Sequence, residues 1–391
     1  MALFLALVAA SLLGLHLATV ALYLRRIARP GPAPRGIGQP PVTLLRPVCG
    51  VDPFDAETLA TSFEQDYPCY DIIFCAQDPA DPVIPLLREL IARHPQVKAQ
   101  LLIGNDPVTG NPKLNNLWKG WQAAGSDWIC MTDANLLLPR DYLSTVVASW
   151  GPGTGIVSSP PVGIRPQGWG GHLECAILNA NQARLQYAAD SLGEGYTQGK
   201  TIFLNRPLLD RAGGFAALGD LLAEDAAATR LIRSLGLRVT LTPLPFAQPI
   251  GRRSLPEVWK RQLRWSRVRR DGFPGLFMLE ILNGATVPAL LALLAAGPEA
   301  ALTYLAVWYL AEALLIRCAG WPGGWRDIAV LPLRDLLMPA LWVATFARRG
   351  FDWRGTDMHQ ATTLATTLAG TRAGTATGTL PKPAPVLSAA E

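Results

Sequence analysis

The chain has 391 residues, which is long enough for one large domain with additional segments. Half of the residues are hydrophobic and only 17% are charged, against about 25% in soluble domains, so the composition argues against a wholly soluble protein. The net charge of +5 is a mild excess, concentrated between Arg252 and Arg270, and it suits anionic lipid headgroups or a phosphate-bearing substrate better than a nucleic-acid groove. The six cysteines form no C-x-x-C pair and accompany no His cluster, so we expect reduced core cysteines rather than a zinc site.

Residues 1–24 contain no charged side chain and predict a transmembrane anchor. A helix of that length spans about 36 Å, enough to cross a hydrocarbon core of about 30 Å. Arg25 and Arg26 follow at once, which places the next region in the cytoplasm by the positive-inside rule. A cleaved signal peptide is the alternative, but its charges would precede the apolar core. Residues 25–41 are rich in Pro and Arg and predict a stiff linker.

Residues 42–250 alternate apolar runs of the strand type with helical patterns. We expect strands at Val42–Leu45, Asp71–Gln77, Lys98–Ile103 and Trp128–Thr132, with helices at 55–65, 82–93 and 114–124 between them. This alternation predicts an α/β fold with a mostly parallel sheet, in which ligands bind at the carboxyl ends of the strands.

Two polar segments directly follow predicted strands. The segment 77–82 carries Asp78 and Asp81, which can contact a uracil and a ribose. The segment 132–135 carries Asp133, which can hold a divalent cation that bridges a diphosphate. An Asp in a loop after a strand is more often a turn former or a helix cap, so neither segment is specific by itself.

Two later segments are also candidates. Asp225 opens a predicted helix at 226–235 and could take a proton from an attacking hydroxyl, although an acidic residue at a helix N-terminus is common without function. Residues 251–272 predict a basic amphipathic interfacial helix that begins at the capping sequence Ser254-Leu255-Pro256-Glu257. Its arginines, among them Arg261 and Arg264, could lie on a membrane surface, engage a diphosphate, or do both.

The C-terminal region 273–350 contains three imperfect apolar stretches, at 276–297, 301–318 and 328–347. Glu280, Glu312 and the pair Arg334/Asp335 interrupt them, and charges at membrane depth usually face protein. Three full crossings would leave Arg348 and Arg349 outside, so one stretch is expected to be re-entrant or interfacial. The tail 351–391 is rich in Thr, Ala, Gly and Pro and predicts disorder.

Taken together, these segments resemble the ceramide glucosyltransferase family, which is inverting and has an A-type nucleotide-sugar fold. The resemblance covers about residues 1–355 and is carried by Asp81, Asp133, Asp225, Arg261-Gln262-Leu263-Arg264-Trp265, Leu45–Pro53, Gln65–Pro68, Asn111–Leu117 and Trp353-Arg354. Each motif is weak alone, whereas the ordered set is specific. Asn135 stands where many nucleotide-sugar enzymes carry a second Asp, which weakens the expected hold on a metal. Lys200 is an unusual charge at its position.

The resemblance implies a UDP-sugar donor, a membrane-embedded lipid acceptor and a role for each matching residue. Asp225 is the expected base, Arg264 with Arg261 stabilises the departing UDP, and Trp265 packs beside the acceptor. The expected donor-binding residues are Asp78, Asp81, Lys113 and Asp133, with Asp133 also the ligand of a Mg²⁺ or Mn²⁺ ion.

The expected reaction transfers a hexose, most simply glucose, to the primary hydroxyl of ceramide and gives a β-glycosylceramide. A hopanoid, another lipid or a polyprenyl phosphate is an alternative acceptor. A processive polysaccharide synthase and a non-enzymatic membrane transporter or scaffold are further alternatives. The sequence predicts a multi-pass membrane protein with a cytoplasmic catalytic domain and no nucleic-acid partner.

Overall fold

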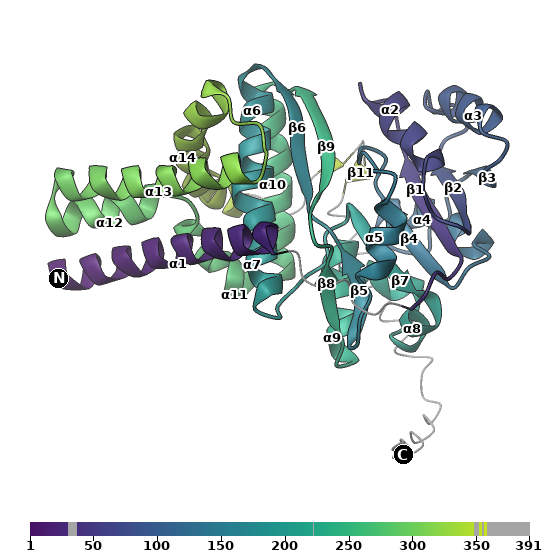
Figure 1. Ribbon diagram of the computed structural model, residues 1–391, viewed down its shortest axis with the longest axis horizontal. Helices are drawn as coiled ribbons and strands as arrows, with labels where there is room; N and C mark the ends of the chain where they lie inside the picture. Colours follow the sequence, from purple (N-terminus) through teal and green to yellow (C-terminus); the bar gives the residue numbers. More distant parts are fainter. Residues whose placement is uncertain (30–36, 222, 348–351, 354–355, 358–391) are drawn as a thin grey trace, which may run out of the picture.

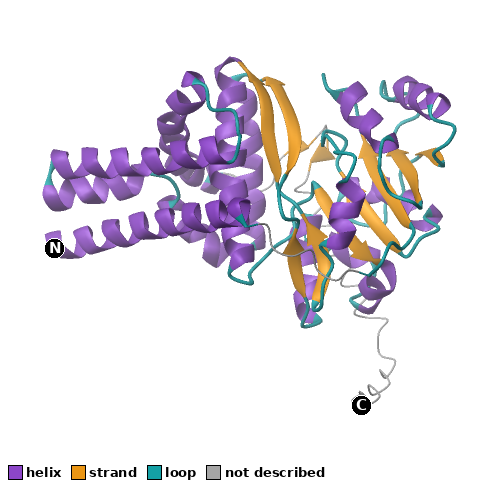
Figure 2. Ribbon diagram, viewed as in Figure 1, coloured by secondary structure: helices purple, strands orange, loops and turns teal. Residues whose placement is uncertain are grey.

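The computed structural model describes residues 1–29, 37–221, 223–347, 352–353 and 356–357 (Figure 1). It consists of a sheet-containing part and a helical part, which lie at opposite ends of the long axis (Figure 2). The predicted linker prolines between 30 and 34, and most of the predicted tail, lie outside the described residues.

The main sheet has seven strands in the order β3-β2-β1-β4-β7-β5-β8. Only β7 runs antiparallel to its neighbours, which confirms the prediction of a mostly parallel sheet. Its strands are β1 (Val42–Val48), β2 (Tyr70–Ala76), β3 (Ala99–Ile103), β4 (Trp128–Thr132), β5 (Thr154–Ser158), β7 (Thr201–Asn205) and β8 (Arg238–Leu241). The central strands are largely buried, and most of their side chains are apolar on both faces, as expected for a sheet covered on both sides.

The helices around the sheet are α2 (Asp55–Ala60), η1 (Thr61–Phe63), α3 (Ile84–Arg93), α4 (Pro112–Ala123), α5 (Tyr142–Ala148), α8 (Arg206–Arg211), η3 (Phe215–Gly219) and α9 (Glu224–Ser234). Those predicted at 55–65, 82–93, 114–124 and 226–235 lie close to their predicted positions, whereas α5, α8 and η3 were not predicted. Helix α4 lies tightly against the sheet because Gly120 has no side chain: a Cβ there would collide with Leu45 and Cys75.

A second, two-stranded parallel ribbon joins the sheet to the helical part. It pairs β6 (Pro161–Gln167) with β9 (Phe246–Arg252). Next to it lies a continuous helical segment made of α6 (Gly168–Ala176), the π-helix η2 (Ile177–Ala183) and α7 (Arg184–Ser191). Gly170 and Gly171 allow α6 to contact the backbone that leads out of β9.

The helical part extends away from the sheet as an arm in which α1 packs against α12 and α13 (Figure 1). Its helices are α1 (Ala2–Ala28), α10 (Leu255–Gly272), α11 (Pro274–Leu279), η4 (Glu280–Leu282), α12 (Thr286–Ala296), α13 (Pro298–Cys318) and α14 (Trp325–Phe346). Among the described residues, α1, α13 and α14 are long and apolar enough to cross a membrane. The pair α11–η4 and α12 also passes this test, but it is bent by 54°, which suits a broken span or a re-entrant loop.

Apolar side chains on the outside of the arm are consistent with a lipid environment. Leu302 and Leu310 of α13 are 67% and 70% exposed, and several other leucines are more than half exposed. Such a surface is unfavourable in water but suits a bilayer. The interrupting charges pair inside the protein: Arg334 binds Glu312 at 2.8 Å and Asp335 at 2.7 Å, all three side chains being buried.

Four details differ from the expectation. The first helix continues through Ala28, and Arg26 near its end binds Asp190 at 2.6 Å, so part of the basic flank holds α1 to the sheet-containing part. Helix α10 packs between α6 and α14 rather than presenting a free amphipathic face. Within the predicted tail, β10 (Asp352–Trp353) pairs with β11 (Thr356–Asp357). All six cysteines are free, but the prediction of core cysteines is right only for Cys75, Cys130 and Cys175; Cys49, Cys69 and Cys318 are exposed.

Candidate active site at the strand ends

A buried arginine fixes the loop that follows β4. Arg46 lies in β1, which pairs with β4, and its side chain is fully buried. Its Nη2 donates to the backbone carbonyls of Asp133, Ala134 and Leu136 at 2.8, 2.9 and 3.1 Å, while Nη1 donates to Thr58 and Ser62. These hydrogen bonds hold three carbonyls of the loop on one planar guanidinium group, while the Asp133 side chain is partly exposed.

Two lysines from separate elements hold the Asp133 carboxylate. Lys113 of α4 contacts one oxygen at 2.7 Å, and Lys200, just before β7, contacts the other at 2.9 Å. Lys200 also donates to the Asn135 amide oxygen at 2.8 Å. Burial alone would raise the pKa of Asp133, but the two ammonium groups outweigh it and hold that pKa well below its usual range. Asp133 is therefore ionised at neutral pH.

Asp225 lies beside this cluster, at the start of α9. Its carboxylate accepts hydrogen bonds from the backbone N–H groups of Gly199, at 3.0 Å, and Ala226, at 2.7 Å. The Gly199 carbonyl in turn accepts from Lys113 at 3.0 Å, and Lys113 also binds Glu224 at 2.6 Å. Burial and the neighbouring Glu224 carboxylate raise the pKa of Asp225 to about 6, in the range of a general base at neutral pH.

The residues predicted to hold a divalent cation do not fit one as they are arranged. Both oxygens of Asp133, and the amide oxygen of Asn135, already contact ammonium groups. A divalent cation at about 4 Å from one such ammonium would be repelled by roughly 8 kcal/mol at an effective dielectric constant of 20. Within the described part of the chain, no group of three or more His, Cys, Asp or Glu side chains could hold a metal. We therefore derive no catalytic step through a metal.

Asp78 and Asp81 lie at the same edge of the sheet but outside this cluster. Asp78 accepts from the backbone of Ala80, as a turn residue does. Asp81 is buried and accepts from Gly50 with both carboxylate oxygens, at 3.1 and 2.9 Å. They follow β2, two strands from β4, which sets the two loops about 10 Å apart. That separation suits the two ends of a nucleoside diphosphate. The contact of Asp78 and Asp81 with the uridine stays a prediction.

Helix α10 brings its arginines to the same region. Arg261 donates to Glu174 of α6 at 3.0 Å, and Glu174 is almost fully buried. Burial lowers the pKa of Lys200, whereas the Asp133 carboxylate acts to raise it. The positive charge of Arg261 also lowers the pKa of Lys200, so this guanidinium lies within electrostatic reach of the cluster. Arg264, one turn along, is half-buried. Trp265 packs inside the protein, against Cys175, Leu178 and Ile250, and its contact with an acceptor is untested.

An apolar groove lies between α6, α10 and α14. It has a volume of about 380 Å³, within the usual range of small-molecule sites, and is lined by Leu173, Leu255, Pro256, Trp259, Leu333 and Leu337. Leu173 precedes Glu174, and Trp259 lies two residues before Arg261. The groove is therefore formed by α14, a helix long enough to cross a membrane, together with the two helices that carry Glu174 and Arg261.

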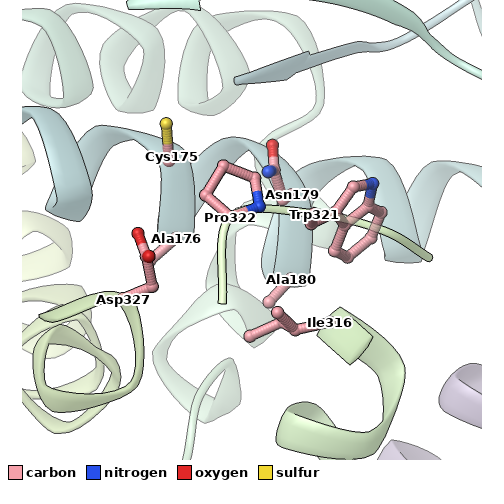
Figure 3. Close-up of a pocket in the computed structure, with 8 residues that line it drawn as sticks. All are labelled: Cys175, Ala176, Asn179, Ala180, Ile316, Trp321, Pro322 and Asp327. Atoms are coloured by element: carbon pink, nitrogen blue, oxygen red, sulfur yellow. The ribbon is translucent and has the colours of Figure 1, made fainter. Parts of the chain in front are cut away.

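A second cavity is too small to bind a substrate. It lies where α6 and η2 meet the segment between α13 and α14, with Cys175, Asn179 and Asp327 among its lining residues (Figure 3). Its volume of about 10 Å³ suits at most a single water. Asp327 is also held by His172 at 2.6 Å, so this junction is structural.

Comparison with known proteins identifies the family. The family model for glycosyl transferase family 21 matches residues 6–363. The chain belongs to this family. Ceramide glucosyltransferase 1 of Caenorhabditis elegans is 26% identical over 255 residues, which are 64% of this chain and 54% of that protein. The ceramide glucosyltransferase of Candida albicans is 38% identical over 120 residues, which are 28% of this chain and 22% of that protein.

The chain thus spans about half the length, or less, of the curated family 21 relatives it matches. Among solved structures, a mannosyltransferase from Pyrobaculum calidifontis in complex with GDP-mannose and Mn²⁺ aligns with a TM-score of 0.51 and 20% identity, covering 88% of this chain and 98% of that one. At this identity the likeness concerns the fold alone, and it confirms the expected A-type glycosyltransferase fold.

The prediction of site residues missed the contacts of three side chains in this family 21 member. Lys200 stood out only as an unusual charge, and Glu224 only as the neighbour of Asp225. Glu174 was not singled out, although a lone carboxylate in the apolar, glycine-rich stretch 168–176 is a usable signal, because a charge in such a stretch needs a partner. Its partner, Arg261, is 87 residues away and comes from another element.

Proposed function

We propose that this chain transfers glucose from UDP-glucose to the primary hydroxyl of ceramide, with inversion, giving a β-glucosylceramide. Family membership and the names of the curated relatives support this reaction. It also agrees with an arm whose helices are long and apolar enough to enter a bilayer.

The position of Asp225 is the observation that carries the proposal. Its carboxylate is fixed by two backbone N–H groups, is connected through Gly199 and Lys113 to Asp133 at the end of β4, and has a pKa of about 6. A base that is fixed, partly desolvated and mostly ionised at neutral pH can accept a proton from an alcohol as it attacks.

The reaction then requires one displacement. The acceptor oxygen loses its proton to Asp225 and forms a bond to C1 of the sugar. The bond between C1 and the diphosphate breaks on the opposite side, and its electron pair leaves with UDP. Arg264, assisted by Arg261, stabilises the leaving diphosphate, because a guanidinium can bind two phosphate oxygens at once. Asp78 and Asp81 contact the uridine, about 10 Å from Asp133.

The groove between α6, α10 and α14 provides a route for the acceptor. Its lining is apolar, and α14 is long and apolar enough to cross a membrane. We propose that a hydrocarbon chain of ceramide enters there while the hydroxyl reaches Asp225. We propose that the chain is a multi-pass membrane protein whose sheet-containing part lies in the cytoplasm, where UDP-sugars are available; the arginines in the last turn of α1 support this orientation by the positive-inside rule.

The test is direct assay of the purified protein in nanodiscs. Ceramide, a hopanoid alcohol and diacylglycerol are each incubated with UDP-glucose, UDP-galactose and UDP-N-acetylglucosamine, and lipid products are identified by mass spectrometry and NMR of the anomeric proton. We expect β-glucosylceramide to be the main product. Absence of any glycosylated lipid, or preference for a non-ceramide acceptor, would contradict the proposal.

A further inference from the structure

The ammonium group of Lys200 lies between the two oxygen ligands that the sequence offers to a cation. Its Nζ is 2.9 Å from Asp133 Oδ2 and 2.8 Å from Asn135 Oδ1. Carboxylate and amide oxygens two residues apart are suited to hold one small cation between them. Here a cation from the chain itself already lies there.

The two lysines of the site differ in what they have left to donate. An ammonium group has three N–H donors. Lys113 directs its donors to Asp133, Glu224 and the Gly199 carbonyl, so all are used within the protein. Lys200 directs two to Asp133 and Asn135. Its side chain is 13% exposed, so the third donor can reach a ligand that enters from the strand ends.

We propose that the Lys200 ammonium takes the place of a divalent cation at Asp133 and Asn135, and that its third N–H binds the diphosphate of the donor, which therefore binds without metal. This inference rests on the proposed function, because it assumes a nucleoside diphosphate at the strand ends. Lys113 acts as a positioning residue that holds Asp133 and Glu224.

The electrostatics of the cluster agree with this arrangement. Asp133 is paired with Lys200, and Glu224 with Lys113, while the neighbouring Asp225 carboxylate is held by the backbone N–H groups of Gly199 and Ala226. A cation that entered would have to displace Lys200 into a partly buried position without a partner, which is costly for a charged group. The negative charge of the diphosphate is met by Lys200 and by the arginines of α10.

The first experiment measures UDP binding to the purified full chain by isothermal titration calorimetry, once with EDTA and once with Mn²⁺. We expect the two dissociation constants to agree within about twofold. Electron paramagnetic resonance of free Mn²⁺ gives a second measurement on the same protein, and we expect no tight Mn²⁺ site without UDP. A tenfold or greater loss of UDP affinity in EDTA, restored by Mn²⁺, would overturn the inference.

The second experiment uses Lys200→Ala, with the exposed Lys98→Met as the matched control and thermal melting as the check on folding. With EDTA, Lys200→Ala should bind UDP about tenfold or more weakly, and Mn²⁺ should restore part of the affinity because Asp133 Oδ2 and Asn135 Oδ1 then lose their ammonium partner. Lys98→Met should behave as wild type. Unchanged UDP affinity of Lys200→Ala in EDTA, or no effect of Mn²⁺ on it, would contradict the role of Lys200.

The outcomes distinguish this inference from the proposed function. If wild-type protein binds no UDP under either condition, the proposed function fails as well. If it binds UDP only with Mn²⁺ and glucosylates ceramide, the function stands and the inference alone is wrong.

Discussion

Arg46 in β1 and Asp133 after β4 are joined by a hydrogen bond of 2.8 Å from the Arg46 Nη2 to the Asp133 carbonyl. The same guanidinium group binds two further carbonyls of that loop, and its side chain is fully buried. One side chain therefore determines the backbone of the segment that carries the central carboxylate of the site. The positions of Lys113 and Lys200 around that carboxylate depend on it.

Replacing Arg46 by Met should destabilise the protein and weaken donor binding together. The substitution leaves buried carbonyls without a donor, which costs roughly 3 kcal/mol or more when the lost partner was charged. Melting temperature in detergent and UDP affinity measure the two effects. Arg88→Met, at a surface position of α3, is the control, since its charge is solvent-exposed. Wild-type UDP affinity in Arg46→Met would show that the loop does not need this anchor.

Asp225→Asn should abolish transfer while the donor still binds. The amide keeps the shape of the side chain but cannot take the proton, so we expect kcat to fall roughly 100- to 10,000-fold with little change in UDP affinity. Product formation from UDP-glucose and ceramide is the measurement. Asp127→Asn, an exposed residue before β4, is the matched control. Activity of Asp225→Asn near the wild-type level would exclude Asp225 as the base.

The pH profile should report the same carboxylate. Since burial and Glu224 raise the pKa of Asp225 to about 6, the base is protonated and inactive below that pH and ionised above it. We expect kcat/KM to rise with pH through about 6 and to level off above it. A profile that is already flat at about pH 5 would mean that the base is a carboxylate with an ordinary pKa.

Gly199→Ala should disturb the site without affecting the sheet. A Cβ at this position would lie 2.9 Å from Glu224 Oε1 and 3.3 Å from Lys113 Nζ, so the ion pair must move. We expect weaker UDP binding and lower kcat with little change in melting temperature. Gly125→Ala is the matched control, because nothing lies within 4 Å of its added Cβ. Equal behaviour of the two variants would contradict the close packing around Lys113.

Filling the apolar groove should affect the acceptor alone. Leu333→Trp adds bulk to the groove, whereas Leu336→Trp, three residues along α14 and 61% exposed, does not line it. In Leu333→Trp, we expect the hydrocarbon chain of ceramide to lose apolar contacts worth about 1–3 kcal/mol. The KM for ceramide should therefore rise tenfold or more, with UDP affinity unchanged. If both variants show the same KM, the hydrocarbon chain binds elsewhere.

Much of the local structure was predictable because it depends on neighbours in the sequence. The apolar run at 128–132 folds as β4 and ends just before Asp133, as expected. Ser254 and Glu257 form the predicted capping box at the start of α10, since both partners lie within one helical turn. The three C-terminal apolar stretches likewise fold as helices. The first of them is interrupted at 283–285, between η4 and α12.

The contacts of the site were less predictable, because they join residues that are distant in the chain. Asp81 accepts hydrogen bonds from Gly50 in the loop after β1, a contact that was not predicted, and its expected contact with the donor stays a prediction. Lys200 reaches Asp133 across 67 residues, and Arg261 reaches Glu174 across 87. No local pattern encodes such pairs, since they require that β7 lie next to β4 and that α6 lie beside α10.

By itself, the sequence determined the mostly parallel sheet, the apolar helices and the order of the acidic and basic motifs, because strand and helix formation follow from the periodicity of nearby side chains. Only the tertiary structure decided which charges meet. The insertion of β7 beside β4 brings Lys200 against Asp133 and Asn135, so the position expected for a divalent cation is filled by an ammonium group of the chain. The physical reason is that ion pairs form between neighbours in space, and the order of strands in the sheet determines which residues become neighbours.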